Sequence, residues 1–205
     1  MENAVSTSLE WAYAGVALPG EIESGDLHVV KHYEGGVLVG VVDGLGHGPE
    51  AAAAARKAVA ALEERPEEAL IRLVQRCHER LKGTRGVVMS LAALDTRNDS
   101  INWLAVGNVE GILVREGSNP SPRIHRILGW GGVVGHNLPE LRPSSLRLKE
   151  GDLLVFASDG IRQEFVEKSD YHDQPQRVAD RICAQFGTRT DDALVLVLRY
   201  RGLNR

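Results

Sequence analysis

Short apolar runs separated by glycine and acidic residues dominate the chain and predict strands. Residues 37–42 are apolar throughout, which is typical of a central strand buried on both faces. The turn-forming residues at 96–99 predict a hairpin, since such residues bond readily to their own backbone. Further strands are expected at residues 9–17, 27–33, 87–94, 100–106, 111–114, 123–127, 152–157 and 193–200.

Three segments carry helical patterns instead. Pro49 is well placed for the first turn of a helix, and the alanine-rich stretch after it allows close packing on a sheet. A second helix is expected from near Pro66, because apolar residues recur there at three- and four-residue steps, and Gly83 is its expected C-terminal cap. Residues 178–186 carry a third apolar stripe, which ends at Gly187.

The order of these elements favours an α+β fold. Strands come first, then two helices, then many strands, and finally one helix and one strand, whereas parallel α/β folds alternate more regularly. We therefore expect antiparallel sheets in the middle and helices on the outside. The 205 residues suit a single domain spanning 1–205, with the glycine-rich loop at 129–135 as its mobile segment.

Composition and charge exclude several classes of protein. Apolar residues make up 43% and charged residues 25% of the chain, as in globular proteins. A formal charge of −4 argues against nucleic-acid binding through a basic surface. No apolar run approaches the roughly 20 residues of a membrane helix, and residues 1–4 do not resemble a signal peptide. A cytoplasmic protein without membrane contact is expected, with Cys77 and Cys183 as reduced thiols.

Aspartates stand at the ends of four predicted strands. Asp43 and Asp159 each end an apolar strand, Asp26 precedes another, and Asp191 and Asp192 precede the last. Carboxylates gathered at one sheet edge repel one another, which raises their pKa values, and a divalent cation removes that cost. Oxygen ligands suit Mg²⁺ or Mn²⁺ rather than Zn²⁺. The alternative is that each aspartate is only a turn residue, and the repeated placement beside apolar strands favours the metal site.

Four motifs surround these aspartates, in the order Ser24-Gly25-Asp26, Val42-Asp43-Gly44-Leu45-Gly46-His47-Gly48, Ala157-Ser158-Asp159-Gly160 and Thr190-Asp191-Asp192-Ala193. Their order and context resemble the metal-dependent protein serine/threonine phosphatases of the protein phosphatase 2C-like type. The second motif and the closing pair of aspartates are most similar to the small bacterial branch that includes SpoIIE and RsbX. Within that branch, a chain without a sensor domain resembles the RsbX group, whose phosphatases reset the stressosome.

The resemblance implies a four-layer αββα sandwich, with two central antiparallel sheets flanked by helices and two Mn²⁺ or Mg²⁺ ions at one edge. Asp43 would bridge the two ions. Asp26 and the Gly44 carbonyl would complete one side, and Asp159 and Asp191 would bind the other ion.

Some positions depart from the family pattern. Asp192 stands where the family more often has Asn, and it is expected behind the metal ligands together with Gly25. Leu45 occupies a position where larger relatives often carry a histidine proposed as the general acid. His47 or a water on a metal ion would then protonate the leaving oxygen, while a capping or core-facing role for His47 is an equal alternative. Glu21 replaces an arginine that holds phosphate, so small phosphoesters are expected to be poor substrates.

The implied reaction is the hydrolysis of phosphoserine and phosphothreonine in proteins. Two cations lower the pKa of a bridging water, and hydroxide attacks phosphorus in line with the leaving oxygen, which gives Asp43 and Asp159 catalytic roles. Asn108 replaces an Asp common in its turn, so no third ion is expected. The implied partners are phosphorylated STAS-domain proteins of the stressosome, and the chain is expected to act as a monomer.

Two further alternatives concern partners. The chain could be a catalytically weak pseudophosphatase that docks a signalling complex, or a phosphatase for small metabolites. Trp130, in the glycine-rich loop, is either packed against the protein or exposed beside the site as a partner contact.

Overall fold

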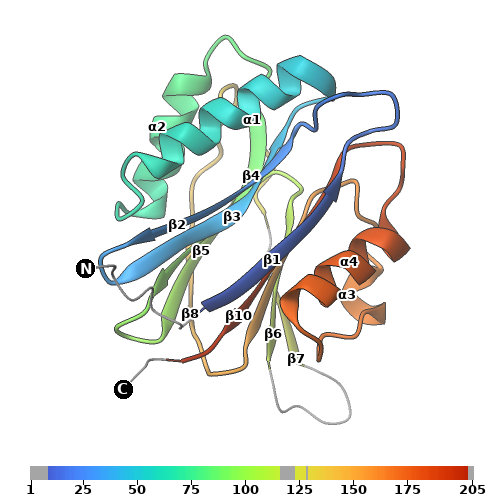
Figure 1. The fold of residues 1–205 in the computed structure, drawn as a ribbon. Helices are drawn as coiled ribbons and strands as arrows, with labels where there is room; N and C mark the ends of the chain where they lie inside the picture. Colours follow the sequence, from blue (N-terminus) through green and yellow to red (C-terminus); the bar gives the residue numbers. More distant parts are fainter. Residues whose placement is uncertain (1–8, 116–122, 128, 203–205) are drawn as a thin grey trace, which may run out of the picture.

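Two five-stranded antiparallel sheets face each other at the centre of the molecule (Figure 1). The computed structural model describes residues 9–115, 123–127 and 129–202, so the expectation for residues 1–4 lies outside it. The strands of the first sheet are, in spatial order, β1 (Leu9–Val16), β10 (Ala193–Tyr200), β9 (Leu153–Ala157), β6 (Glu110–Arg115) and β7 (Arg123–Ile127). Those of the second are β2 (Asp26–Tyr33), β3 (Gly36–Gly44), β4 (Val87–Asp95), β5 (Ser100–Val106) and β8 (Ser144–Arg147).

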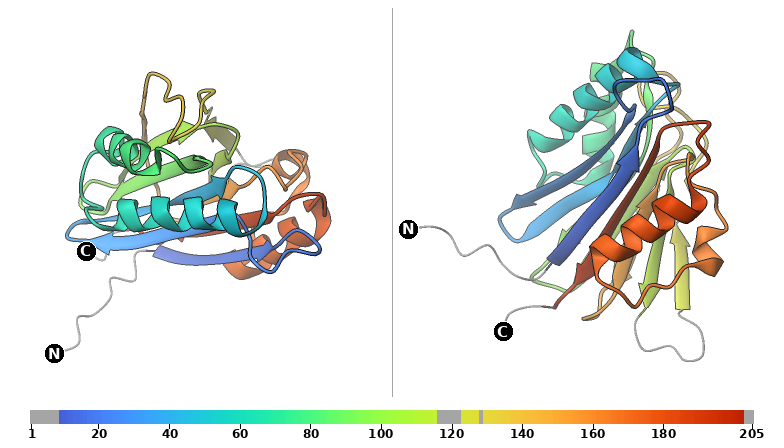
Figure 2. Two further views of the ribbon diagram at one scale, coloured as in Figure 1. Left: turned by 90° about the horizontal axis from the view of Figure 1, so that it is seen from above. Right: turned by 45° about the vertical axis from the view of Figure 1, so that its right-hand side comes forward.

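Helices cover both outer faces of the sheets. The helices α1 (Gly48–Glu63) and α2 (Leu70–Leu81) lie against the second sheet, where α1 contacts β2 and β3. The helices α3 (Phe165–Lys168) and α4 (Pro175–Phe186) lie on the opposite side, where α4 contacts β1 and β10. Figure 2 shows the resulting order of helix layer, sheet, sheet and helix layer. The expected α+β fold and its four-layer αββα arrangement are confirmed.

Three apolar cores separate these four layers. Strand β3 is buried along its whole length because its alternate side chains enter two different cores. Val39 and Val41 point between the two sheets, while Leu38 and Val42 point toward α1 and α2. Strand β10 does the same on the other side, so a run of apolar residues without polar alternation marks a strand covered on both faces.

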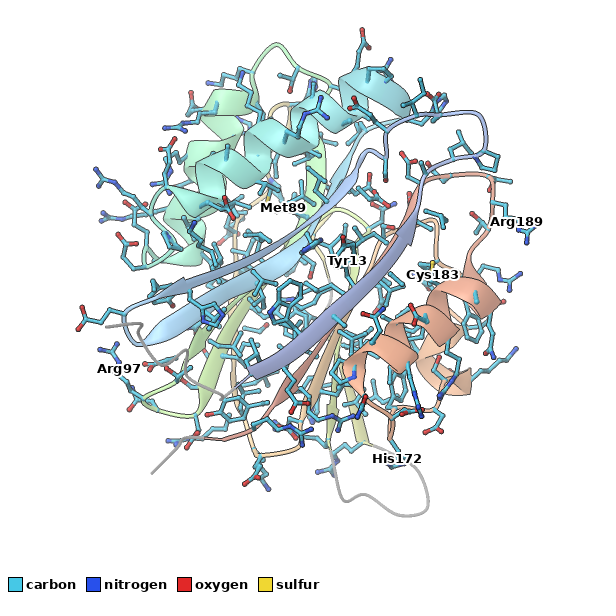
Figure 3. The ribbon with its side chains drawn as sticks, viewed as in Figure 1. Tyr13, Met89, Arg97, His172, Cys183 and Arg189 are labelled. Atoms are coloured by element: carbon cyan, nitrogen blue, oxygen red, sulfur yellow. The ribbon has the colours of Figure 1, made fainter. Side chains whose placement is uncertain are left out.

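Strands β1 and β2 are edge strands that lie beside each other at one side of the sandwich (Figure 1). The ring of Tyr13 on β1 points toward β2 (Figure 3) and lies 4.1 Å from the ring of His28, centroid to centroid. Trp11 packs on the same histidine at 5.6 Å. These rings fill the seam between the two sheets on that side.

The structure corrects three details of the element prediction. Strand β8 and helix α3 were not predicted, because the first is a four-residue segment with a single apolar residue and the second is a single turn. The second helix begins at Leu70 rather than near Pro66, since the Glu68 amide donates to the Arg65 carbonyl (3.1 Å) in a separate turn. Gly83 does follow the helix with a positive φ of 79°, as its capping role requires.

The glycine-rich loop at 129–135 is tied to the second sheet. Val134 exchanges two backbone hydrogen bonds with Val87, and the Gly107 amide donates to the Trp130 carbonyl at 2.8 Å. The loop expected to be mobile is therefore anchored at two points.

Both cysteines are free thiols, as expected, with Cys77 fully buried. Burial raises the pKa of the Cys77 thiol to about 12. In the described part of the chain, no helix combines the length and apolar character needed to cross a bilayer.

Candidate metal centre

Asp26 and Asp43 face each other across β2 and β3 at the end of the second sheet. Side chains directly opposite in an antiparallel pair have Cβ atoms about 4.5–5.5 Å apart, and like charges there destabilise the pair. Both side chains are buried, with 4% and 9% of their surface exposed. The Oδ2 atom of Asp26 is buried without a hydrogen-bond partner among the described residues. Such a pair is costly unless a proton or a cation lies between the carboxylates.

The pKa values of these two groups reflect that cost. The pKa of Asp43 is raised from 3.8 to about 9, mainly by burial and in addition by the charges of the neighbouring aspartates, that of Asp26 first. Burial also raises the pKa of Asp26 to about 7, although a hydrogen bond with Ser158 opposes the shift. The folded protein therefore favours neutral carboxyl groups here when no cation is present.

The other three aspartates reach the same edge from the first sheet. Asp159 follows β9, and Asp191 and Asp192 precede β10, which pairs with β9. The two loops touch so closely that a Cβ atom on Gly160 would lie 1.9 Å from the Asp192 carbonyl oxygen. Strand β3 contacts both β9 and β10 across the sandwich. The charges of all three aspartates contribute to the raised pKa of Asp43, so the loops that carry them lie on the same side of the molecule as Asp43.

Glycine is required beside Asp43 for a related reason. A Cβ atom on Gly44 would lie 2.3 Å from the carbonyl oxygen of Ala51 in α1, a distance that no side chain tolerates. The Asp-Gly pairs at the end of β3 and after β9 are thus places where the backbone packs directly on another segment.

Asp192 organises the loop that leads into β2. Its Oδ1 atom accepts the Leu18 amide at 2.8 Å, and its Oδ2 atom accepts the Gly25 amide at 2.7 Å. A Cβ atom on Gly25 would lie 2.9 Å from the Cβ atom of Ala51 and 3.1 Å from Asp192 Oδ2. Because both carboxylate oxygens are engaged and the side chain is 2% exposed, Asp192 holds the chain next to Asp26. This is the position expected for a residue behind the ligands.

His47 lies at the start of α1 and is exposed. Its Nδ1 atom is 2.6 Å from Glu21 Oε1, and 56% of its side chain is accessible. The ring makes no hydrogen bond that caps α1, so neither the capping nor the core-facing alternative is observed. The charge of His47 lowers the pKa of Asp191, while burial raises that pKa overall. The His47 ring therefore pairs with Glu21, and its role as a general acid stays a prediction.

Asn108 is the residue whose contact sequence reasoning missed. Its Nδ2 atom donates to Asp159 Oδ2 at 2.8 Å. The sequence showed Asn108 only as a replacement for an aspartate, and nothing local indicates that the turn after β5 meets the turn after β9. This hydrogen bond restrains one carboxylate oxygen of Asp159.

Trp130 is exposed, with 48% of its surface accessible. The guanidinium of Arg142 lies over its ring, 5.4 Å from the centroid. The loop is therefore one of the exposed surfaces near Asn108, while a partner contact through Trp130 remains a prediction.

The donor atoms at this edge fit a divalent cation that prefers oxygen. All the candidate side-chain ligands are carboxylates, and one oxygen of the buried Asp26, which is opposite Asp43, has no hydrogen-bond partner among the described residues. Within the described ranges, however, no three Asp, Glu, His or Cys side chains form a ready-made ligand set. Carboxylates without a cation repel one another, so the final approach of the ligands would accompany metal binding.

Comparison with known proteins gives the family. The model of the family described as Stage II sporulation protein E (SpoIIE) matches residues 33–201. No curated protein matches the sequence.

Several solved structures share the fold. One, described as "The bacterial stressosome: a modular system that has been adapted to control secondary messenger signaling", is 34% identical, with a TM-score of 0.83 over 93% of this chain and 99% of that chain. RsbX in complex with magnesium is 18% identical, with a TM-score of 0.81 over 94% and 95%. The catalytic domain of the serine threonine protein phosphatase PstP in complex with two manganese ions is 16% identical, with a TM-score of 0.72 over 94% and 98%. The chain belongs to the SpoIIE family of protein phosphatase 2C-like serine/threonine phosphatases.

Proposed function

We propose that the chain removes phosphate from phosphoserine and phosphothreonine in proteins with the aid of two divalent cations, Mn²⁺ or Mg²⁺. The observation that carries this proposal is the buried Asp26–Asp43 pair, in which one carboxylate oxygen has no partner. The groups that would hold the ions are the carboxylates of Asp26, Asp43, Asp159 and Asp191 and the carbonyl oxygen of Gly44.

Some residues of the site would hold the metal ions, and others orient the residues that hold them. When bound, two cations screen the charge of the phosphate and lower the pKa of a water, which supplies hydroxide at neutral pH. Asp43, which is opposite Asp26 on the neighbouring strand, would contribute its carboxylate to both ions. Asn108 orients Asp159, and Asp192 fixes the backbone next to Asp26. His47 is exposed on the same side and can donate a proton to the leaving oxygen.

The residues beside the aspartates favour a protein substrate over a small phosphoester. Glu21 places a carboxylate beside His47 instead of a phosphate-binding cation, so recognition has to come from a protein surface around the phosphorylated residue. The relative from the stressosome study is 34% identical over almost the whole chain, which supports phosphorylated STAS-domain proteins of a stressosome as substrates. We place this reaction in the cytoplasm and assign it to a monomer.

A dephosphorylation assay tests the proposal. A phosphorylated STAS-domain scaffold protein is incubated with the chain in Mn²⁺ or in excess chelator, and released phosphate is measured. Turnover is expected only with metal, and Asp43→Ala and Asp159→Asn should abolish it. Asp180→Asn, at an exposed position on α4, is the matched control and should behave like the wild type.

The outcomes separate the phosphatase from the pseudophosphatase. Binding of the scaffold protein without any turnover in Mn²⁺ or Mg²⁺ would support the docking role. Full turnover by metal-free Asp43→Ala protein would refute the proposed chemistry.

A further inference from the structure

A groove of about 900 Å³ begins in the loop that joins β3 to α1. This loop, residues 45–47, directly follows the proposed ligands Asp43 and Gly44 and is called the metal-binding loop below. Leu45 and Gly46, which directly follow Gly44, form its near end. One wall is the stripe of α1 that carries Glu50, Ala53 and Lys57. The opposite wall is made by residues 83–85, Val133 and His136.

The groove is fixed to the metal-binding loop by short contacts. The Leu45 amide donates to the Gly86 carbonyl at 3.1 Å. Arg85 lies so close to the loop that a Cβ atom on Gly46 would be 2.6 Å from its Nη1 atom. A chain that brings a phosphorylated side chain to the aspartate cluster therefore has this groove beside its neighbouring residues, since an extended chain advances about 3.3 Å per residue.

The floor of the groove is apolar, and the charged side chains along its walls give it a net positive charge. Leu45, Ala53 and Val133 offer the apolar surface. The Arg85 guanidinium is balanced by Glu50, at 2.6 Å. Lys57 has no ion-pair partner among the residues that the structure describes, so one cation in the groove is not neutralised.

The groove is much larger than a phosphate group alone requires. Pockets for drug-sized molecules occupy roughly 300–1,000 Å³, and the groove lies near the top of that range. The apolar floor offers no favourable contact to a charged phosphate group, whereas apolar side chains of a peptide would bury this floor.

We propose that this groove binds the segment of the substrate protein that flanks the phosphorylated residue, with an apolar side chain on Leu45 and Ala53 and an acidic side chain against Lys57. The inference rests on the proposed phosphatase function. In this proposal the groove, and not the metal centre, determines which residues next to the phosphorylated residue are preferred in a substrate.

Synthetic phosphoserine peptides test the proposal. Each eleven-residue peptide has phosphoserine at its centre and one leucine, and each carries either Glu or Lys at one of the flanking positions. The wild type should prefer Glu over Lys at one position by about threefold in kcat/KM, as expected for one partly exposed ion pair. Lys57→Glu should reverse that preference, which a purely structural role of Lys57 would not do.

A second variant tests the apolar floor. Ala53→Trp fills the groove from an exposed helix position and should raise KM for the peptides by about tenfold relative to p-nitrophenyl phosphate, which has no flanking segment. Ala60→Trp, two turns further along the same exposed face of α1, is the control and should leave both substrates unaffected.

The possible results are distinguishable. If the peptides are turned over but Lys57→Glu keeps the preference of the wild type and Ala53→Trp keeps its KM, the groove is not the docking site and the phosphatase function stands. If a phosphorylated STAS-domain protein is hydrolysed with Mn²⁺ or Mg²⁺ but none of the peptides is, the groove is not the docking site and the phosphatase function stands. If neither the peptides nor that protein is hydrolysed, the proposed function fails and the inference fails with it.

Discussion

Removal of divalent cations should make the stability of this protein fall as the pH rises from about 5 to about 8. Burial and neighbouring charges raise the pKa of Asp43 to about 9 and that of Asp26 to about 7, against 3.8 for an ordinary aspartate. In this pH range the unfolded chain has lost both protons, while in the folded chain Asp43 keeps its proton throughout and Asp26 keeps its proton up to about pH 7. The folded protein therefore binds more protons than the unfolded one, so its free energy of unfolding decreases with increasing pH.

The magnitude follows from proton linkage. One retained proton lowers the free energy of unfolding by about 1.4 kcal/mol per pH unit. Asp43 retains its proton over the whole range, which gives a loss of about 4 kcal/mol from pH 5 to 8. Asp26 adds to that loss below its own pKa of about 7. This is a large part of the roughly 5–15 kcal/mol that stabilises a typical domain.

Urea unfolding followed by tryptophan fluorescence, in chelator and at several pH values, measures the effect. His28 acts in the opposite sense, because burial lowers its pKa and its stability contribution is lost as the pH falls. Subtracting the curve of the Asp43→Asn variant from that of the wild type cancels the contribution of His28, since both proteins contain this residue. The variant should lose less stability between pH 5 and 8, and saturating Mn²⁺ should abolish the decline in the wild type.

A flat or rising free energy of unfolding in chelator would refute this reasoning if Asp43→Asn gave the same curve. The two carboxylates would then not be buried against each other, and the electrostatic case for a cation would be lost.

The remaining predictions concern residues around the cluster. Asn108→Ala should weaken Mn²⁺ binding by about tenfold, because residues that orient ligands typically contribute 10–100-fold to affinity, and calorimetric titration measures it. Asp192→Ala removes the acceptor of two backbone amides and should lower the free energy of unfolding by about 2–4 kcal/mol, measured in urea. Glu21→Arg should raise kcat/KM for p-nitrophenyl phosphate, because a cation replaces the carboxylate beside His47; an unchanged value would show that residue 21 does not face the substrate.

The parts of the fold that were predictable are those whose signal is local. Strand β3 enters two cores, so residues 37–42 are all apolar and the pattern identifies a central strand. Strand β8 is a four-residue edge strand with a single apolar residue, Leu146, and has no such pattern. The start of α2 was misplaced because the charged turn around Pro66 continues the spacing of the helix without being helical.

The candidate site also has features that local sequence predicts and contacts that it does not. The aspartates at strand ends were visible because each follows or precedes an apolar run. The contact between Asn108 and Asp159 was not visible, because it joins two turns that only the pairing of β6 with β9 brings together. The pair of His47 with Glu21 likewise depends on how the loop before β2 lies against the start of α1.

Calorimetric titration of the metal-free protein with Mn²⁺ tests the central claim most directly. The account predicts two ions bound per chain, and it predicts that Asp43→Asn weakens binding of both, because this carboxylate is shared between them. An Asp43→Asn protein that binds two ions as tightly as the wild type, or a wild type that binds none, would contradict it.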